Sequence, residues 1–121
     1  MVTMDIPTAI RSYQFGERAK SGLIISSQLA MALADFSDQE KAGGRRMLLL
    51  LMESVRSEIQ FAANSTGNQS FTKAINALNE AISLVESNQL QQVPERLAAA
   101  ISASTTPAQE ASDILTGHGY L

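Results

Sequence analysis

Apolar residues recur at helical spacings of three and four along most of the chain, and no stretch shows the strict alternation of a strand. Ser37, with Glu40 three residues later, forms a capping box between the first two apolar segments. So short a connection makes the two flanking helices antiparallel neighbours. The sequence therefore predicts an all-α fold, a single-domain antiparallel bundle of four to five helices built on a long N-terminal helical hairpin. The expected helices are residues 10–36, 38–63, 71–86, 94–103 and 107–116.

Two prolines indicate where the later helices begin. Pro94 fits the first turn of a helix, where its missing N–H costs nothing, so it is expected to open the fourth helix after a break over residues 87–93. The alternative for residues 87–93 is a continuous helix, because apolar residues keep the helical period there. Thr106 followed by Pro107 repeats the start signal, a capping side chain before a proline, so a separate fifth helix is expected.

The second half of the segment 10–36 is apolar almost all round. Its apolar residues fall on two lines at helical spacing. A helix end of this kind is normally enclosed by neighbouring elements on more than one side, so both lines are expected to be covered. One line contains Ile25, Leu29, Ala32 and Phe36, and the other contains Ile24, Ser27, Met31 and Ala34.

The segment 38–63 also carries two lines, on separate faces of the helix. The first line is apolar throughout and is expected to face the core. The second line mixes large apolar residues with small ones, and small residues admit the close approach of another backbone. This second line is the candidate interface. The first line contains Leu48, Met52, Val55, Ile59 and Ala62, and the second line contains Gly43, Met47, Leu50, Ser54, Ser57 and Phe61.

Helix lengths indicate what can cover the hairpin. At 1.5 Å per residue, the segment 38–63 spans about 39 Å and the segment 71–86 spans about 24 Å. The later helices can cover the hairpin only if the helices over 94–103 and 107–116 lie end to end with the helix over 71–86. Otherwise a second subunit covers the hairpin. The second line favours the second subunit, so a homodimer with two-fold symmetry is expected.

Composition narrows the function classes. The 121-residue chain is 45% hydrophobic and 17% charged, which is typical of a globular protein rather than a disordered one. A net charge of −3 and the lack of a basic recognition helix argue against nucleic-acid binding, including by a helix-turn-helix. The most lipid-like run, about 13 residues from Gly22 to Ala34, is shorter than the roughly 20 residues of a membrane helix. With no cysteine and no secretory signal, we expect a cytoplasmic protein without disulfides or thiolate metal sites.

Side chains that carry chemistry are few and scattered. His118 is the only histidine, so no pair of histidines can hold a metal ion. Glu53 and Glu58 are five residues apart, and Glu80 and Glu86 are six apart, which puts the members of each pair on different helix faces. No catalytic residue, metal site or cofactor is expected, and the chain is not predicted to be an enzyme.

A small basic cluster offers an alternative function. Arg45 and Arg46 lie in the first turns of the second helix, near the positive end of its dipole, where they can contact an anion. Ion pairs with Asp35, Asp38 and Glu40 are the competing interpretation. The leading hypothesis is a non-catalytic protein-interaction or assembly module that acts through an apolar helix face and binds itself or another protein. The alternative is a small-molecule or anion-binding bundle, or an enzyme subunit, that uses the two arginines.

Overall fold

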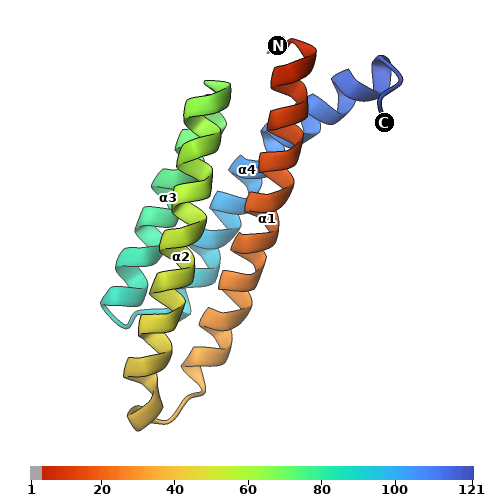
Figure 1. Cartoon of the computed structure of the whole chain (residues 1–121). Helices are drawn as coiled ribbons and strands as arrows, with labels where there is room; N and C mark the ends of the chain where they lie inside the picture. The colour runs from red at the N-terminus through yellow and green to blue at the C-terminus, as the bar shows by residue number, and fades with distance from the viewer. Residues whose placement is uncertain (1–3) are drawn as a thin grey trace.

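Four long helices run alternately up and down and pack side by side (Figure 1). The computed structural model describes residues 4–121. In chain order the helices are α1 (Ile6–Ala34), α2 (Asp38–Thr66), α3 (Gln69–Glu86) and α4 (Val93–Gly117), with a short 3-10 turn, η1 (Leu90–Gln92), before α4. Within residues 4–121 there is no strand. The prediction of an all-α antiparallel bundle built on an N-terminal helical hairpin is confirmed.

α1 begins at Ile6, four residues before the predicted start at residue 10. The Asp5 carboxylate caps it by accepting a hydrogen bond from the Thr8 N–H at 2.8 Å. Hydrogen bonding to Thr8, through its side chain first and its N–H second, lowers the pKa of Asp5 below its usual value. Pro7 lies in the first turn, where its missing N–H is not needed. α1 ends at Ala34, two residues before the predicted end. The capping side chain, rather than the apolar period, sets the start of this helix.

α2 is bounded by a capping interaction at one end and a left-handed glycine at the other. The Glu40 carboxylate accepts hydrogen bonds from the Ser37 N–H at 3.3 Å and from the Ser37 hydroxyl at 2.8 Å. Gly67 has a φ of 66°, a conformation that favours glycine, and its N–H donates to the Ala63 carbonyl oxygen at 2.9 Å. α2 therefore continues to Thr66, three residues beyond the predicted end.

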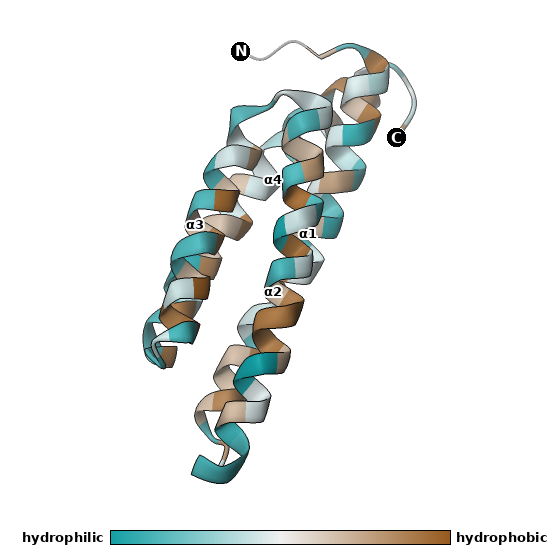
Figure 2. Ribbon diagram, turned by 60° about the vertical axis from the view of Figure 1, so that its left-hand side comes forward, coloured by the Kyte–Doolittle hydropathy of each residue, from teal (hydrophilic) through white to brown (hydrophobic). Residues whose placement is uncertain are grey.

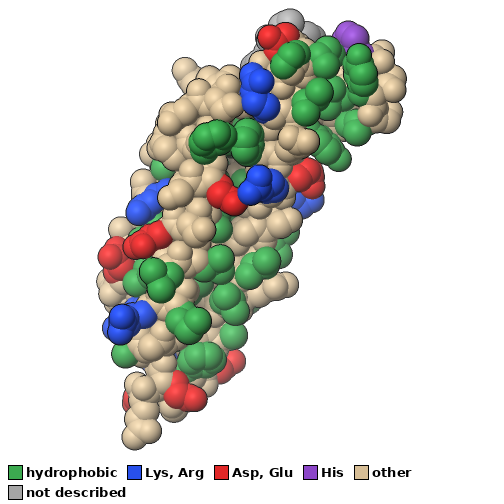
Figure 3. Space-filling view, viewed as in Figure 1, with side chains coloured by type: hydrophobic (Ala, Val, Ile, Leu, Met, Phe, Trp, Pro, Cys, Tyr) green, Lys and Arg blue, Asp and Glu red, His purple; other side chains and the backbone are tan. Residues whose placement is uncertain are grey.

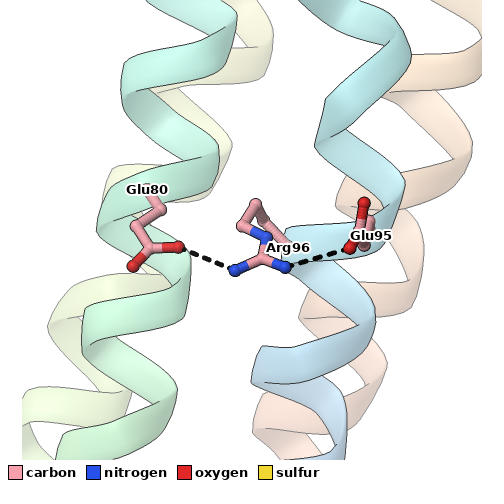
Figure 4. A network of polar contacts seen from close by, with 3 residues as sticks. All are labelled: Glu80, Glu95 and Arg96. Carbon is pink, nitrogen blue, oxygen red and sulfur yellow. Dashed lines mark hydrogen bonds and ion pairs between the residues drawn. The ribbon is translucent and has the colours of Figure 1, made fainter.

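The connection between α3 and α4 is the break expected over residues 87–93. η1 occupies part of it, and α4 has Pro94 as its second residue. Beside this connection, Arg96 of α4 donates hydrogen bonds to Glu80 of α3 at 3.0 Å and to Glu95 at 3.2 Å (Figure 4). These bonds, chiefly the one to Glu80, raise the pKa of Arg96. The bond to Glu80 joins α3 to the first turns of α4.

α4 continues through Pro107, so the prediction of two separate helices over 94–103 and 107–116 is wrong. Thr106 does not start a new helix, and its hydroxyl donates to the Ser102 carbonyl oxygen at 3.1 Å. Small residues of α4 beyond the proline pack against the N-terminal part of α1, and their burial outweighs the hydrogen bond that proline cannot donate. Figure 1 shows this C-terminal part of α4 inclined away from the bundle axis.

The core lies between the inward faces of the four helices. Every residue of the first line of α2 is buried, as its spacing predicts. Phe71 and Leu78 of α3 are fully buried beside it, with Leu23 of α1 and Leu97 of α4. Figure 2 shows that the most hydrophobic part of α2 is its middle, while the end nearest the hairpin bend is hydrophilic. The middle of α2 therefore supplies most of its share of the core.

α1 and α4 approach closely where both carry small side chains. A Cβ on Gly16 would lie 2.7 Å from Ala108 Cβ and 2.9 Å from the Ser104 carbonyl oxygen, closer than real Cβ atoms come. Beyond this crossing, Ala9 of α1 and Leu115 of α4 belong to a second, smaller core. The crossing therefore requires glycine at position 16.

Replacing glycine by alanine is expected to have opposite effects on stability at Gly16, which lies at the crossing, and at Gly43, which does not. Gly16→Ala is expected to lower the free energy of unfolding by roughly 1–3 kcal/mol, because the α4 backbone must move. Gly43→Ala, a position with nothing within 4 Å, is expected to raise it by roughly 0.5–1 kcal/mol through helix propensity. Urea unfolding followed by circular dichroism at low protein concentration measures both changes. A Gly16→Ala protein as stable as the wild type would contradict the crossing.

Candidate functional site

Most of the bulky apolar residues in the second half of α1 lie outside the core, and Leu23 and Leu33 are the buried exceptions. Both lines predicted to be enclosed are exposed, apart from the half-buried Ser27, so that prediction is wrong for this chain. The reason is size, because small residues let α1 approach α4 closely and the line that permits this approach is the buried one. The buried line of α1 contains Ala9, Ser12, Gly16, Ala19, Leu23, Ser26, Ala30 and Leu33.

The second line of α2 is exposed along its whole length. Met47, Leu50 and Phe61 expose 74%, 66% and 62% of their surfaces, whereas Leu48 of the first line exposes 3%. Residues 4–121 thus leave uncovered the line that the sequence indicates as an interface. What covers it stays a prediction.

The exposed parts of α1 and α2 adjoin along the hairpin. Residues at intervals of seven, about two helical turns, lie against α2 along α1 and into the turn that follows it. These contacts are Phe15 with Phe61, Gly22 with Val55, and Phe36 with Gly44. Leu29 lies on the same line of α1, and Ile25 follows seven residues after Arg18, which pairs with Glu58 of α2. Ile25 and Leu29 of α1 are therefore next to the second line of α2.

We term the combined surface the hairpin face; it comprises Ile25, Leu29 and Phe36 from α1 and the following turn, and Met47, Leu50 and Phe61 from α2. Figure 3, which has α1 and α2 toward the viewer, shows hydrophobic side chains along this side with acidic and basic groups between them. Arg18 and Glu58 form one such pair, 2.9 Å apart. Next to it is a shallow hollow of about 360 Å³, lined by Phe15, Arg18, Ser54, Ser57, Glu58 and Phe61.

An aromatic contact lies at the end of the hairpin face that is farther from the hairpin bend. The rings of Phe15 and Phe61 meet edge to face, with centroids 5.5 Å apart and an angle of 65° between their planes. Such pairs are favourable beyond the area that they bury. The contact holds the Phe61 ring in place although most of its surface stays open to solvent. The hairpin face therefore presents at least one large side chain that is already ordered.

Arg45 and Arg46 do not converge on a binding pocket. Among residues 4–121, no ion pair joins either arginine to the acidic side chains near the hairpin bend. Arg46 borders a shallow hollow of about 220 Å³ with Leu49, Leu50 and Glu53. The Glu53 carboxylate would repel an anion at that place. The lining of this hollow contains no second basic side chain, and the predicted anion contact stays a prediction.

A polar hollow of about 370 Å³ lies between the α2–α3 turn and the start of α1. Three of its polar side chains, those of Thr8, Thr66 and Asn68, hydrogen-bond within the protein, whereas the buried Ser12 hydroxyl has no hydrogen-bond partner. The Thr66 hydroxyl donates to the Ala62 carbonyl oxygen at 2.7 Å, and the Asn68 side-chain oxygen accepts from the Ser70 N–H at 2.9 Å. Lys73 is its one ionisable lining residue.

The remaining candidate groups are dispersed. His118 is exposed at the end of α4, with its Nδ1 2.9 Å from the Ile114 carbonyl oxygen. Over residues 4–121, no three or more His, Asp or Glu side chains gather as a metal ion would require. Nor does any helix in that range combine the length and apolar character needed to cross a membrane. The site that these residues offer is the hairpin face.

A scan against models of protein families, a search of curated proteins and a search of solved structures each found no match to this chain.

Two leucines of α2 provide a matched test of which line holds the fold. Leu48→Ala is expected to lower the free energy of unfolding by about 2–5 kcal/mol, because it leaves a cavity in the core. Leu50→Ala is expected to change it by no more than about 0.5 kcal/mol, because Leu50 is exposed. Chemical denaturation at low protein concentration measures both. Equal losses at the two positions would mean that the second line belongs to the core.

Proposed function

We propose that this chain is a non-catalytic protein-interaction or assembly module that acts through the hairpin face. One observation carries the proposal: Met47, Leu50 and Phe61 are exposed while the first line of the same helix is buried. Single exposed apolar residues are ordinary on soluble proteins. Here they continue onto Ile25 and Leu29 of the neighbouring helix. An apolar surface that extends over two helices is typical of a protein–protein interaction site.

The make-up of the hairpin face suits a protein partner. Interfaces commonly combine an apolar centre, aromatic anchors and a charged rim. The apolar residues of the hairpin face lie along two helices. Next to them are the aromatic contact of Phe15 with Phe61 and the ion pair of Arg18 with Glu58. The groove between two packed helices also matches the shape of a third helix. These features support a helical partner surface rather than a small ligand.

The proposed setting is the cytoplasm. The chain has no cysteine, so its fold does not depend on the oxidising conditions under which disulfides form.

Site-specific photo-crosslinking in the native host tests the proposed function. A benzophenone amino acid in place of Leu50 is expected to form a discrete adduct with a protein, because Leu50 lies in the hairpin face. The same amino acid in place of Asn76, an exposed polar residue of α3, is the matched control and is expected to form none. Equal crosslinking at both positions, or none at either, would rule out the hairpin face as the interaction surface.

A further inference from the structure

We infer that the partner of the hairpin face is a second copy of this chain, docked with its α2 antiparallel to the first. The inference rests on the proposed function and names the partner. Its basis is the order of large and small residues along the exposed second line of α2. From its N-terminal end, that line reads Gly43, Met47, Leu50, Ser54, Ser57 and Phe61.

The second line is complementary to itself when its direction is reversed. Consider a two-fold axis that is perpendicular to α2 and passes at the level of Met52. A residue a given number of positions before Met52 in one copy then lies level with the residue the same number of positions after Met52 in the other copy. Every large residue of one copy then meets a small residue of the other, and each such contact occurs twice. The pairs are Phe61 with Gly43, Met47 with Ser57, and Leu50 with Ser54. Pairs of large and small side chains let two helices pack closely without voids.

Other arrangements of the two helices lose this match. Moving the axis by half a heptad brings Met47 level with Leu50 of the second copy, and leaves Gly43 opposite Ser54. A parallel arrangement sets each residue against its own copy, so Phe61 meets Phe61 and Gly43 meets Gly43. Both alternatives place large groups against large groups and leave gaps between the small ones, which well-packed interfaces do not contain.

The charges of α2 favour the same antiparallel arrangement. No residue of the second line is ionisable, and the segment 59–66 carries no charge. Antiparallel docking brings the charged first turns of α2 level with that neutral segment, and brings Arg46 level with Glu58 of the second copy. Parallel docking would bring Arg46 level with Arg46, and like charges repel. The helix dipoles also oppose each other in the antiparallel pair.

α1 adds apolar surface at the two-fold axis. Gly22 faces Val55 and Leu33 faces Gly44, so α1 runs antiparallel to α2 with Ile25 level with position 52. The exposed Ile25 side chains of both copies therefore flank the axis. The second line spans about 27 Å along α2. A standard interface takes about 800 Å² from each partner, which is roughly one-ninth of the 6896 Å² surface of this chain.

Light scattering coupled to size exclusion tests whether the pure protein is a dimer. The expected mass at micromolar concentration is 26 kDa, twice the 13.0 kDa of the chain. Leu50→Glu is expected to weaken association at least about tenfold, as a central contact should. Met31→Glu changes an apolar residue that is also exposed but lies outside the hairpin face, and is expected to leave the dimer intact. A monomeric wild type, or a dimer that Leu50→Glu does not weaken, would overturn the inference.

Single cysteines test the direction of docking, because the natural chain has none. Met47→Cys and Ser57→Cys proteins are oxidised separately and as a mixture. The mixture is expected to form a disulfide-linked dimer, and neither protein is expected to do so alone, because identical positions lie about 15 Å apart along the antiparallel pair. A disulfide requires Cα atoms within about 7 Å of each other. Crosslinking of each protein alone, without further gain in the mixture, would indicate parallel docking and overturn the inference.

The two proposals fail in distinguishable ways. A monomeric pure protein that still forms an adduct through position 50 in the host would overturn the second copy as partner and leave the proposed function standing. A monomeric protein without any adduct at position 50 would overturn both. An adduct of twice the chain mass, together with the mixed cysteine crosslink, would support both.

Discussion

The close packing of α1 on α4 through small side chains is the constraint on which the rest of the structure depends. Gly16 allows the two backbones to meet at Ala108, and the other buried residues of α1 are mostly alanine and serine. These small residues occupy most of the inward side, where Leu23 and Leu33 are the only large residues in the second half of α1, and Ile24, Ile25 and Leu29 lie on its other sides. The apolar surface beside α2 is thus a consequence of how the core is built.

α2 serves two purposes on two sides. Its first line buries large apolar side chains against the other helices, and this burial supplies stability in proportion to the area removed from water. Its second line contributes little to that burial, so it can change without unfolding the chain. Stability and association are therefore carried by different residues of one helix, and the ordered Phe61 ring lies on the side that association would use.

The sequence was most informative where apolar residues contrast with their neighbours. Both lines of α2 could be predicted for this reason, and the bend at Ser37 could be predicted from its capping partner. The buried side of α1 could not be predicted in this way, because alanine, serine and glycine differ little in hydropathy from residues that commonly lie on an exposed surface. Pro107 misled because its local signal is that of a helix start, and only the packing of α4 on α1 overrides it. Phe15 was missed as part of the site, although its seven-residue spacing to Gly22, Leu29 and Phe36 was a usable signal.

The inclined end of α4 has a consequence for local motion. Beyond the Gly16 crossing, only the first turns of α1 and the last turns of α4 pack together, around Ala9, Ala111 and Leu115. So small a core opens at a lower free energy than the whole bundle, because fewer apolar contacts are lost. Backbone amides in the first turns of α1 and the last turns of α4 are therefore expected to exchange with solvent ahead of those around Phe71 and Leu78. These turns are expected to open and close together while the rest of the bundle stays folded.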